Sequence, residues 1–133
     1  MSSFTFTFQL DLKSGVPVYR QLIDQVLGAI ASGRVSGGDQ LPTVRQVAVD
    51  LSINPNTVVR AYRELEIRGI VSTQQGIGTF ITPQQIKPDE ADRQRQLSSL
   101  IGEFMARAGA VGFTAEDVLG RIHEFVSEQR RSS

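Results

Sequence analysis

Two short amphipathic helical patterns follow each other almost directly in residues 43–65, TVRQVAVDLSINPNTVVRAYREL. Their close succession is the strongest indication of the fold. Asn54 and Pro55 mark the start of the second helix, since an asparagine side chain caps free backbone amides and proline suits the first helical position. Thr43 can cap the first helix. Hydrophobic residues follow the i, i+3, i+4, i+7 spacing of one buried face in both helices: Val44, Val47, Ala48 and Leu51, then Val58, Ala61, Tyr62 and Leu65. Two such helices joined so tightly predict a helix-turn-helix.

A third helix and a β-hairpin flank this pair. Pro17 can open the upstream helix, which ends near Gly33. Its expected buried residues are Leu22, Ile23, Val26, Leu27 and Ile30. Downstream, Gly69 ends the helix, and two β-prone stretches, IVST and TFIT, enclose a turn that contains two glycines. Three helices followed by a hairpin give the order of a winged helix-turn-helix, so residues 1–83 are predicted to form a mainly α domain with a small β-hairpin.

Residues 4–12 alternate between hydrophobic and polar side chains. The hydrophobic set is Phe4, Phe6, Phe8, Leu10 and Leu12. This period of two predicts a short half-buried strand or an extended arm that packs on the domain.

Residues 84–133 are predicted to form a linker and two further helices. Asp89 can cap the first of these, and Thr114 with Asp117 gives the second a start that resembles a capping box. Their hydrophobic positions are Leu97, Leu100, Ile101, Phe104 and Ala108, then Val118, Leu119, Ile122, Phe125 and Val126. Two helices cannot enclose a core alone, so these faces pack either on the winged domain or, as we favour, on the same pair in a second chain. The segment is therefore predicted to hold a homodimer together.

Composition limits the classes of function. The chain has 133 residues, with 14 Lys and Arg against 14 Asp and Glu, and no cysteine. Residues 1–83 hold seven basic and six acidic side chains (+1), and residues 84–133 hold seven and eight (−1). Any DNA binding must therefore rest on a few well-placed arginines. Because no apolar run reaches the length of a membrane span and the first residues do not resemble a signal peptide, we expect a cytoplasmic protein without membrane contact.

No group of residues indicates catalysis. His123 has no second histidine within its helix to share a metal ion. The acidic residues near 90 and 116 fall in first helical turns, where they complement the helix dipole. The glycines of the predicted hairpin turn join two strands, and a phosphate loop would instead open a helix. No enzyme activity, metal or cofactor is expected.

Three motifs, VPVYRQL, GDQLPTVRQVAVDLSINPNTVVRAYRELEIRGIV and GIGTF, resemble those of the GntR family of bacterial transcription regulators. The resemblance covers roughly residues 8–83. The short two-helix tail is similar to that of the YtrA-like subfamily. The resemblance implies a homodimeric repressor that binds double-stranded DNA at a palindromic operator, often one that controls its own operon together with genes for an ABC transporter. It identifies neither the operator sequence nor a small-molecule effector.

The start of the second helix of the helix-turn-helix suits DNA recognition, because such a helix enters the major groove with its N-terminal residues at the base edges. Asn56 is free to make a bidentate contact with adenine, and Thr57 to bond a phosphate or touch a thymine methyl group. The resemblance implies DNA contacts at Arg45, Asn54, Asn56, Thr57, Gln75 and Gly76. Arg60 and Arg63 are further candidates, although a solvated role explains them equally well. Many relatives carry arginines at the positions of Asn54 and Pro55, so their base preference does not transfer to this chain.

Several alternatives accompany these assignments. One alternative is that Arg45 pairs with Asp39 or Asp50 on the surface, and another is that Gln75 is only a solvated turn residue. Tyr19 and Tyr62 lie on hydrophobic faces, where a core role with a satisfied hydroxyl is favoured over base stacking. The competing function is a winged-helix adaptor for protein partners. The near-neutral charge agrees with an adaptor, whereas the polar exposed face of the helix argues against it, since adaptor surfaces present large hydrophobic anchors.

Overall fold

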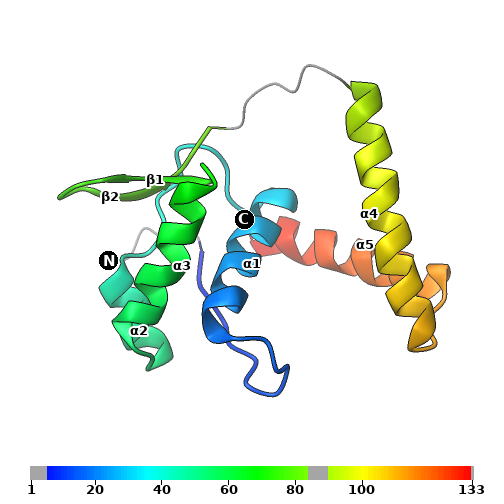
Figure 1. Cartoon of the computed structure of the whole chain (residues 1–133), viewed down its shortest axis with the longest axis horizontal. Helices are drawn as coiled ribbons and strands as arrows, with labels where there is room; N and C mark the ends of the chain where they lie inside the picture. The colour runs from blue at the N-terminus through cyan, green and yellow to red at the C-terminus, as the bar shows by residue number, and fades with distance from the viewer. Residues whose placement is uncertain (1–5, 84–89, 133) are drawn as a thin grey trace. The chain divides into compact units, whose positions relative to one another are not determined.

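The computed structural model describes residues 6–83 and 90–132, with side chains as far as residue 128, and divides the chain into two units (Figure 1). The first unit contains three helices and a β-hairpin, and the second contains two helices. This mainly helical architecture with one two-stranded sheet in the described residues confirms the predicted fold class.

The first unit is built around a core shared by α1 (Val18–Ala31), α2 (Val44–Leu51) and α3 (Pro55–Ile67). Both other helices pack against α3. The large side chains that are buried most completely are Leu22, Ile23, Val26, Leu41, Val58, Leu65 and Ile81. Every residue predicted on the inner faces of α2 and α3 is buried or half-buried, which confirms the spacing argument. In α1, Leu22, Ile23 and Val26 are buried as predicted, and Leu27 and Ile30 are half-buried and pack against the core.

Local hydrogen bonds fix the geometry of the helix-turn-helix. Thr43 Oγ1 accepts the backbone N–H of Gln46 at 3.0 Å, and Asn54 Oδ1 accepts that of Asn56 at 2.8 Å. Both predicted caps are therefore present. Between the helices, Ser52 has a φ of 55°, a left-handed conformation that ends α2 and redirects the chain into α3.

The hairpin consists of β1 (Val71–Gln74) and β2 (Gly78–Ile81), which pair in antiparallel register with Val71 opposite Ile81. Both of these residues are buried and anchor the open end of the hairpin in the core. The other end points away from the helices (Figure 1). This arrangement confirms the predicted wing.

The chain before α2 is more regular than the predicted loop, because it runs along β2. Gln40 forms an isolated bridge with Phe80. The N–H of Leu41 donates to the carbonyl oxygen of Thr79 at 2.8 Å. A single bridged residue leaves no periodic pattern in the sequence, so the pairing of this segment with β2 was not predicted.

The N-terminal segment is an extended arm and makes no strand pairing with the rest of the described chain. Phe6 and Phe8 are buried as predicted, whereas Leu12 is 82% exposed, so the alternation does not extend to the end of the segment. The N–H of Gln9 donates to Gln25 Oε1 at 2.9 Å, and the side-chain amide of Gln25 donates back to the carbonyl oxygen of Gln9. A glutamine of α1 thus replaces the missing partner strand. Phe4 lies outside the described residues.

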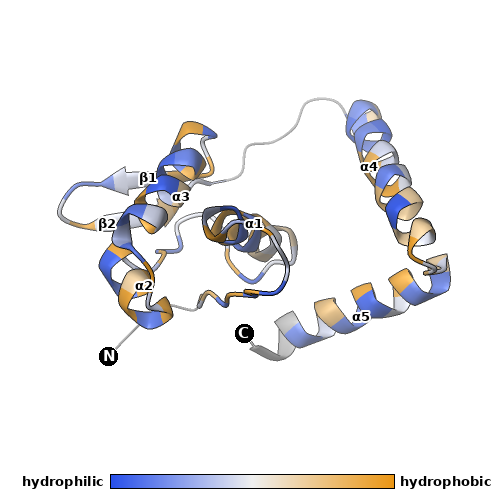
Figure 2. Ribbon diagram, turned by 60° about the horizontal axis from the view of Figure 1, so that its bottom comes forward, coloured by the Kyte–Doolittle hydropathy of each residue, from blue (hydrophilic) through white to orange (hydrophobic). Residues whose placement is uncertain are grey.

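The second unit consists of α4 (Glu90–Ala110) and α5 (Ala115–Ser132). The N–H of Thr114 donates to Asp117 Oδ2 at 3.0 Å, and the N–H of Asp117 donates to Thr114 Oγ1 at 3.1 Å, so the predicted capping box is present. Hydrophobic and hydrophilic residues alternate along both helices (Figure 2). Large hydrophobic side chains remain exposed at Leu97, Leu100, Ile101, Phe104, Leu119, Ile122 and Phe125. The predicted cap Asp89 and the predicted linker, residues 84–88, lie outside the described residues.

Candidate nucleic-acid interface

The first turn of α3 presents a polar surface. Asn54 uses its side-chain oxygen as the helix cap, which leaves its NH₂ group to donate outward. Asn56 is exposed and Thr57 is half-exposed. Neither side chain forms a hydrogen bond with another described residue. The donor and acceptor groups of Asn56 and Thr57 are therefore available to a ligand at the helix start.

Arg45, in the first turn of α2, lies beside this helix start. It lines the same surface hollow, of about 560 Å³, as Pro55 of α3. Its two alternative carboxylate partners bind elsewhere: Asp39 accepts the N–H of Ser36 at 2.9 Å, and Asp50 accepts the side-chain amide of Gln46 at 3.0 Å. Within the described chain, Arg45 has no ion pair, so its charge is uncompensated.

The arginines of α3 differ from one another. Arg63 is exposed and, in the described part of the chain, has no ion pair. Arg60 is exposed too, but its Cζ atom lies 3.7 Å from the centre of the Tyr19 ring. Arg68, which directly follows the helix as its C-cap, pairs with Glu64 at 3.2 Å. Among these three arginines in the described chain, Arg60 and Arg63 therefore resemble Arg45, since each carries a positive charge that no carboxylate neutralises.

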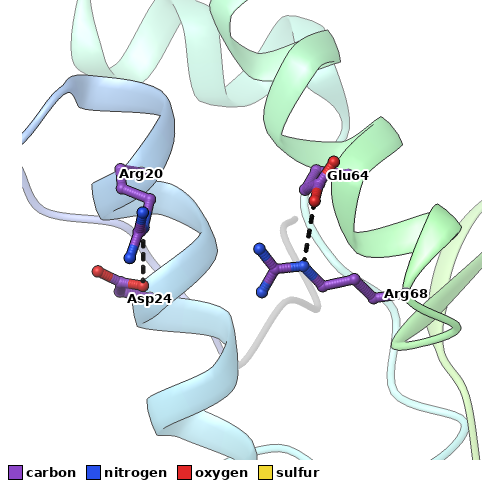
Figure 3. A network of polar contacts seen from close by, with 4 residues as sticks. All are labelled: Arg20, Asp24, Glu64 and Arg68. Carbon is purple, nitrogen blue, oxygen red and sulfur yellow. Dashed lines mark hydrogen bonds and ion pairs between the residues drawn. The ribbon is translucent and has the colours of Figure 1, made fainter.

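Two ion pairs are formed by residues of α1 and of the C-terminal end of α3 (Figure 3). Arg20 pairs with Asp24 within α1 at 3.8 Å, and Arg68, the residue that follows α3, pairs with Glu64 of that helix. Each pair joins residues one turn apart and is well exposed, so it contributes little to stability. The paired arginines serve as natural comparisons for the unpaired ones.

The tip of the wing consists of Gln75, Gly76 and Ile77. Gly76 has a φ of 81°, a conformation that favours glycine. The Gln40 side chain donates to the carbonyl oxygen of Ile77 at 3.2 Å, and its amide occupies the place that a Cβ on Gly78 would need. Gln75 is exposed and, within the described chain, its side chain is not hydrogen-bonded. The Gln40 side chain thus contacts the tip of the wing at Ile77 and Gly78, while the Gln75 side chain faces solvent.

Tyr62 is a core residue, as predicted. Its hydroxyl donates to the carbonyl oxygen of Pro42 at 2.6 Å and ties α3 to the chain before α2. Burial raises the pKa of the Tyr62 hydroxyl well above its ordinary value. Tyr19 differs from the same prediction, because it is half-buried and its hydroxyl has no hydrogen-bond partner among the described residues. The guanidinium of Arg60 lies over its ring.

Sequence reasoning missed the residues that support this surface. Gln40 lies in a segment without periodicity, and the Tyr19 ring was assigned to the core because it falls on the hydrophobic face of α1. Gln21 was also overlooked: it is buried, and its amide donates to the carbonyl oxygens of Asp11 and Val16 at 2.9 Å each. Gln21 and Gln25 are one turn apart on α1, and nothing in their spacing alone indicates that they bind the backbone of the N-terminal segment.

Other kinds of site find little support. The described residues contain no group of three side chains able to hold a metal ion. No helix in that part of the chain is both long and apolar enough to cross a bilayer.

Comparison with known proteins adds independent information. Residues 18–81 match the model for bacterial regulatory proteins of the gntR family. The chain is 34% identical over 113 residues to the uncharacterized HTH-type transcriptional regulator YhcF of Bacillus subtilis, and the match covers 85% of this chain and 93% of that protein. It is 32% identical over 120 residues to the HTH-type transcriptional repressor YtrA of the same organism, covering 90% and 89%. The solved structure of YtrA from Sulfolobus acidocaldarius, a GntR-family transcription factor, is 30% identical with a TM-score of 0.53, covering 91% of this chain and 97% of that chain. The similarity thus extends over both units.

Proposed function

Because this chain belongs to the gntR family of bacterial regulatory proteins, we propose that it represses transcription as a homodimer bound to a palindromic operator. The family consists of transcriptional regulators with a DNA-binding domain and not of enzymes, and the relatives that match both units are of the YtrA and YhcF type. Repression is proposed because one of these relatives is named a transcriptional repressor.

The observation that carries the proposal is the unoccupied polar start of α3. A recognition helix reads bases in the major groove with its N-terminal residues. Asn56 offers the paired donor and acceptor that match adenine, and Thr57 offers a hydroxyl and a methyl group. Neither is used inside the described protein. Base readout is therefore assigned to Asn56, with Asn54 and Thr57 as neighbouring contacts.

Phosphate contacts are assigned to the unpaired arginines and to the wing. Arg45 lies beside the helix start, and Arg63 lies on the exposed face of α3. Each would neutralise a phosphate without first breaking an internal ion pair. Gln75 and Gly76 at the tip would reach the adjacent backbone or minor groove. Because the whole chain has no net charge, non-specific binding should be modest.

The homodimer is proposed from the exposed faces of α4 and α5. Leu100, Phe104 and Ile122 are each more than half exposed in the single chain. Contiguous hydrophobic surface of this kind usually marks an interface. A second copy brings an identical face, and a two-fold dimer carries two winged units, which matches a palindrome. Action in the cytoplasm and control of an operon with ABC transporter genes follow from the family resemblance as further parts of the proposal.

Binding to a randomised pool of DNA duplexes tests the proposal. The wild-type protein should enrich a palindromic sequence, whose affinity is then measured by fluorescence anisotropy at several salt concentrations against a scrambled duplex. Asn56→Ala should lose about 1 to 3 kcal/mol on the enriched duplex and relax the preference at one base pair, with little change on the scrambled duplex. Arg45→Ala should weaken both complexes and lower the salt slope by about one.

Arg20→Ala is the matched control, because Arg20 is exposed but paired with Asp24. It should bind both duplexes as the wild type does. Thermal melts of all variants verify that each is folded. If no sequence is enriched, the protein-adaptor function takes first place. If a palindrome is enriched but folded Asn56→Ala and Arg45→Ala bind it normally, the assignment of DNA contacts to these two residues is wrong.

A further inference from the structure

Arg60 is the one arginine of α2 and α3 in the described chain whose side chain rests on an aromatic ring of another helix. Its Cζ atom lies 3.7 Å from the centre of the Tyr19 ring, and Tyr19 belongs to the first turn of α1. The two helices pack against each other. The contact therefore crosses from the helix that supports the core to the helix with the polar start.

A stacked arginine keeps its hydrogen-bonding capacity. At 3.7 Å the guanidinium lies against the ring, well inside the limit of about 6 Å for a cation–π contact. The five N–H groups of a guanidinium point outward in its plane, so a ring on one face does not consume them. Arg60 is exposed and has no carboxylate partner among the described residues. Its charge and donors thus remain available while the position of its head group is restricted.

The direction of this restriction indicates the kind of DNA contact. Arg60 lies four residues after Asn56, one turn further along the exposed face of α3. Tyr19 holds the guanidinium toward α1, to one side of that face. When a recognition helix lies in the major groove, its N-terminal residues reach the base edges, and side chains that lean to either side of the helix reach the sugar–phosphate backbone. A guanidinium held at the flank is placed for a phosphate.

We propose that Tyr19 is a positioning residue that holds the Arg60 guanidinium beside α1, where Arg60 binds a DNA phosphate and does not read a base. This inference rests on the proposed DNA-binding function. Tyr19 itself touches no DNA. Its effect comes from ordering a long side chain before binding, so that less conformational entropy is lost in the complex. Arg63, which has no such ring, provides the internal contrast.

A double-mutant cycle measured on binding tests the proposal, with the enriched and scrambled duplexes as probes. Arg60→Ala should weaken both complexes by the same factor and lower the salt slope by about one. Tyr19→Leu should weaken both by roughly two- to tenfold, in line with the cost of ordering one flexible side chain. In the Arg60→Ala background, Tyr19→Leu should have no further effect. Tyr19→Phe keeps the ring and should restore the affinity lost in Tyr19→Leu.

Several results would overturn the proposal. Additive losses in the double variant would mean that Tyr19 does not act through Arg60. A lower melting temperature for Tyr19→Leu with unchanged DNA affinity would mean that the contact between Tyr19 and Arg60 only stabilises the packing of α1 on α3. A relaxed base preference in Arg60→Ala would make Arg60 a base reader. If wild type binds and Asn56→Ala is impaired while Tyr19→Leu is normal, only this inference fails; if the wild type enriches no duplex, the proposed function itself fails.

Discussion

The two units of the chain use the same amphipathic pattern with opposite results. In the winged unit, Leu65 is completely buried, because α1, α2 and the hairpin cover the inner face of α3. In the two-helix unit, Leu100 occupies an equivalent place on a hydrophobic stripe and is 61% exposed. Three helices and a sheet can surround a core, whereas two helices leave one side open. The core of the first unit is therefore closed within one chain, and we propose that the second unit is half of an interface.

The largest difference should appear when a leucine is shortened. Leu65→Ala should lower the free energy of unfolding by about 2 to 5 kcal/mol, because it leaves a cavity in a closed core. Chemical denaturation measures this change. Leu12→Ala is the control, since Leu12 is 82% exposed, and should change stability by less than about 0.5 kcal/mol. Equal effects of the two variants would contradict the assignment of the core.

The second unit should respond through association. Phe104→Asp should weaken the dimer by about 2 to 4 kcal/mol, because it places a charge on a hydrophobic face that the partner must cover. Sedimentation at a series of protein concentrations measures the dissociation constant. Ser99→Asp adds the same charge at a position off the hydrophobic stripe and should leave the dimer intact. A Phe104→Asp protein that dimerises like the wild type would place the interface elsewhere.

Tyr62 makes the stability of the first unit depend on pH in the alkaline range, and the second unit has no tyrosine. Tyr62→Phe should cost about 1 to 3 kcal/mol, because the buried carbonyl of Pro42 loses its donor. Burial raises the pKa of Tyr62 in the folded state above the value of about 10 in the unfolded chain, so the unfolded chain loses its proton first. The contribution of Tyr62 is therefore complete below about pH 10 and declines as the pH rises further. Denaturation of wild type and Tyr62→Phe between pH 8 and 11, a range set about the ordinary tyrosine pKa, should show this decline in the wild type alone.

The smallest effects should come from the helix caps. Asn54→Ala and Thr114→Ala each remove a side-chain acceptor at a helix start and should cost about 1 kcal/mol. The loss in Asn54→Ala should not depend on protein concentration, because α3 belongs to the closed unit. The loss in Thr114→Ala should also weaken the proposed dimer, because we assign α5 to its interface. Melting curves at two concentrations distinguish these responses, and the reverse pattern would refute the division of roles.

Much of the fold follows from local sequence. The caps at Thr43, Asn54 and Thr114 and the buried faces of α2 and α3 depend on neighbours within one or two turns, so spacing alone predicts them. The arm could not be settled in this way. A period of two shows that Phe6 and Phe8 are buried but cannot show that glutamine side chains of α1, and not another strand, bind its backbone.

The candidate site was predictable in part for the same reason. Residues of the α3 start are contiguous, and a cap motif followed by free polar side chains is visible in the sequence. That Arg45 has no carboxylate partner was not, because Asp39 and Asp50 are near it in the chain and only the fold shows that they bind elsewhere. The stacking of Arg60 on Tyr19 and the support of the wing by Gln40 join residues about 40 positions apart, which no local pattern encodes.

The most direct test of the contrast between the two units is the mass of the protein–DNA complex, measured by sedimentation on the enriched duplex. Two chains of wild type should bind one duplex in a single cooperative step. The Phe104→Asp protein, whose winged unit is intact, should bind in two separate steps of much lower affinity, because the second site no longer benefits from a linked partner. A single wild-type chain on the duplex, or an unchanged affinity and stoichiometry in Phe104→Asp, would contradict the account.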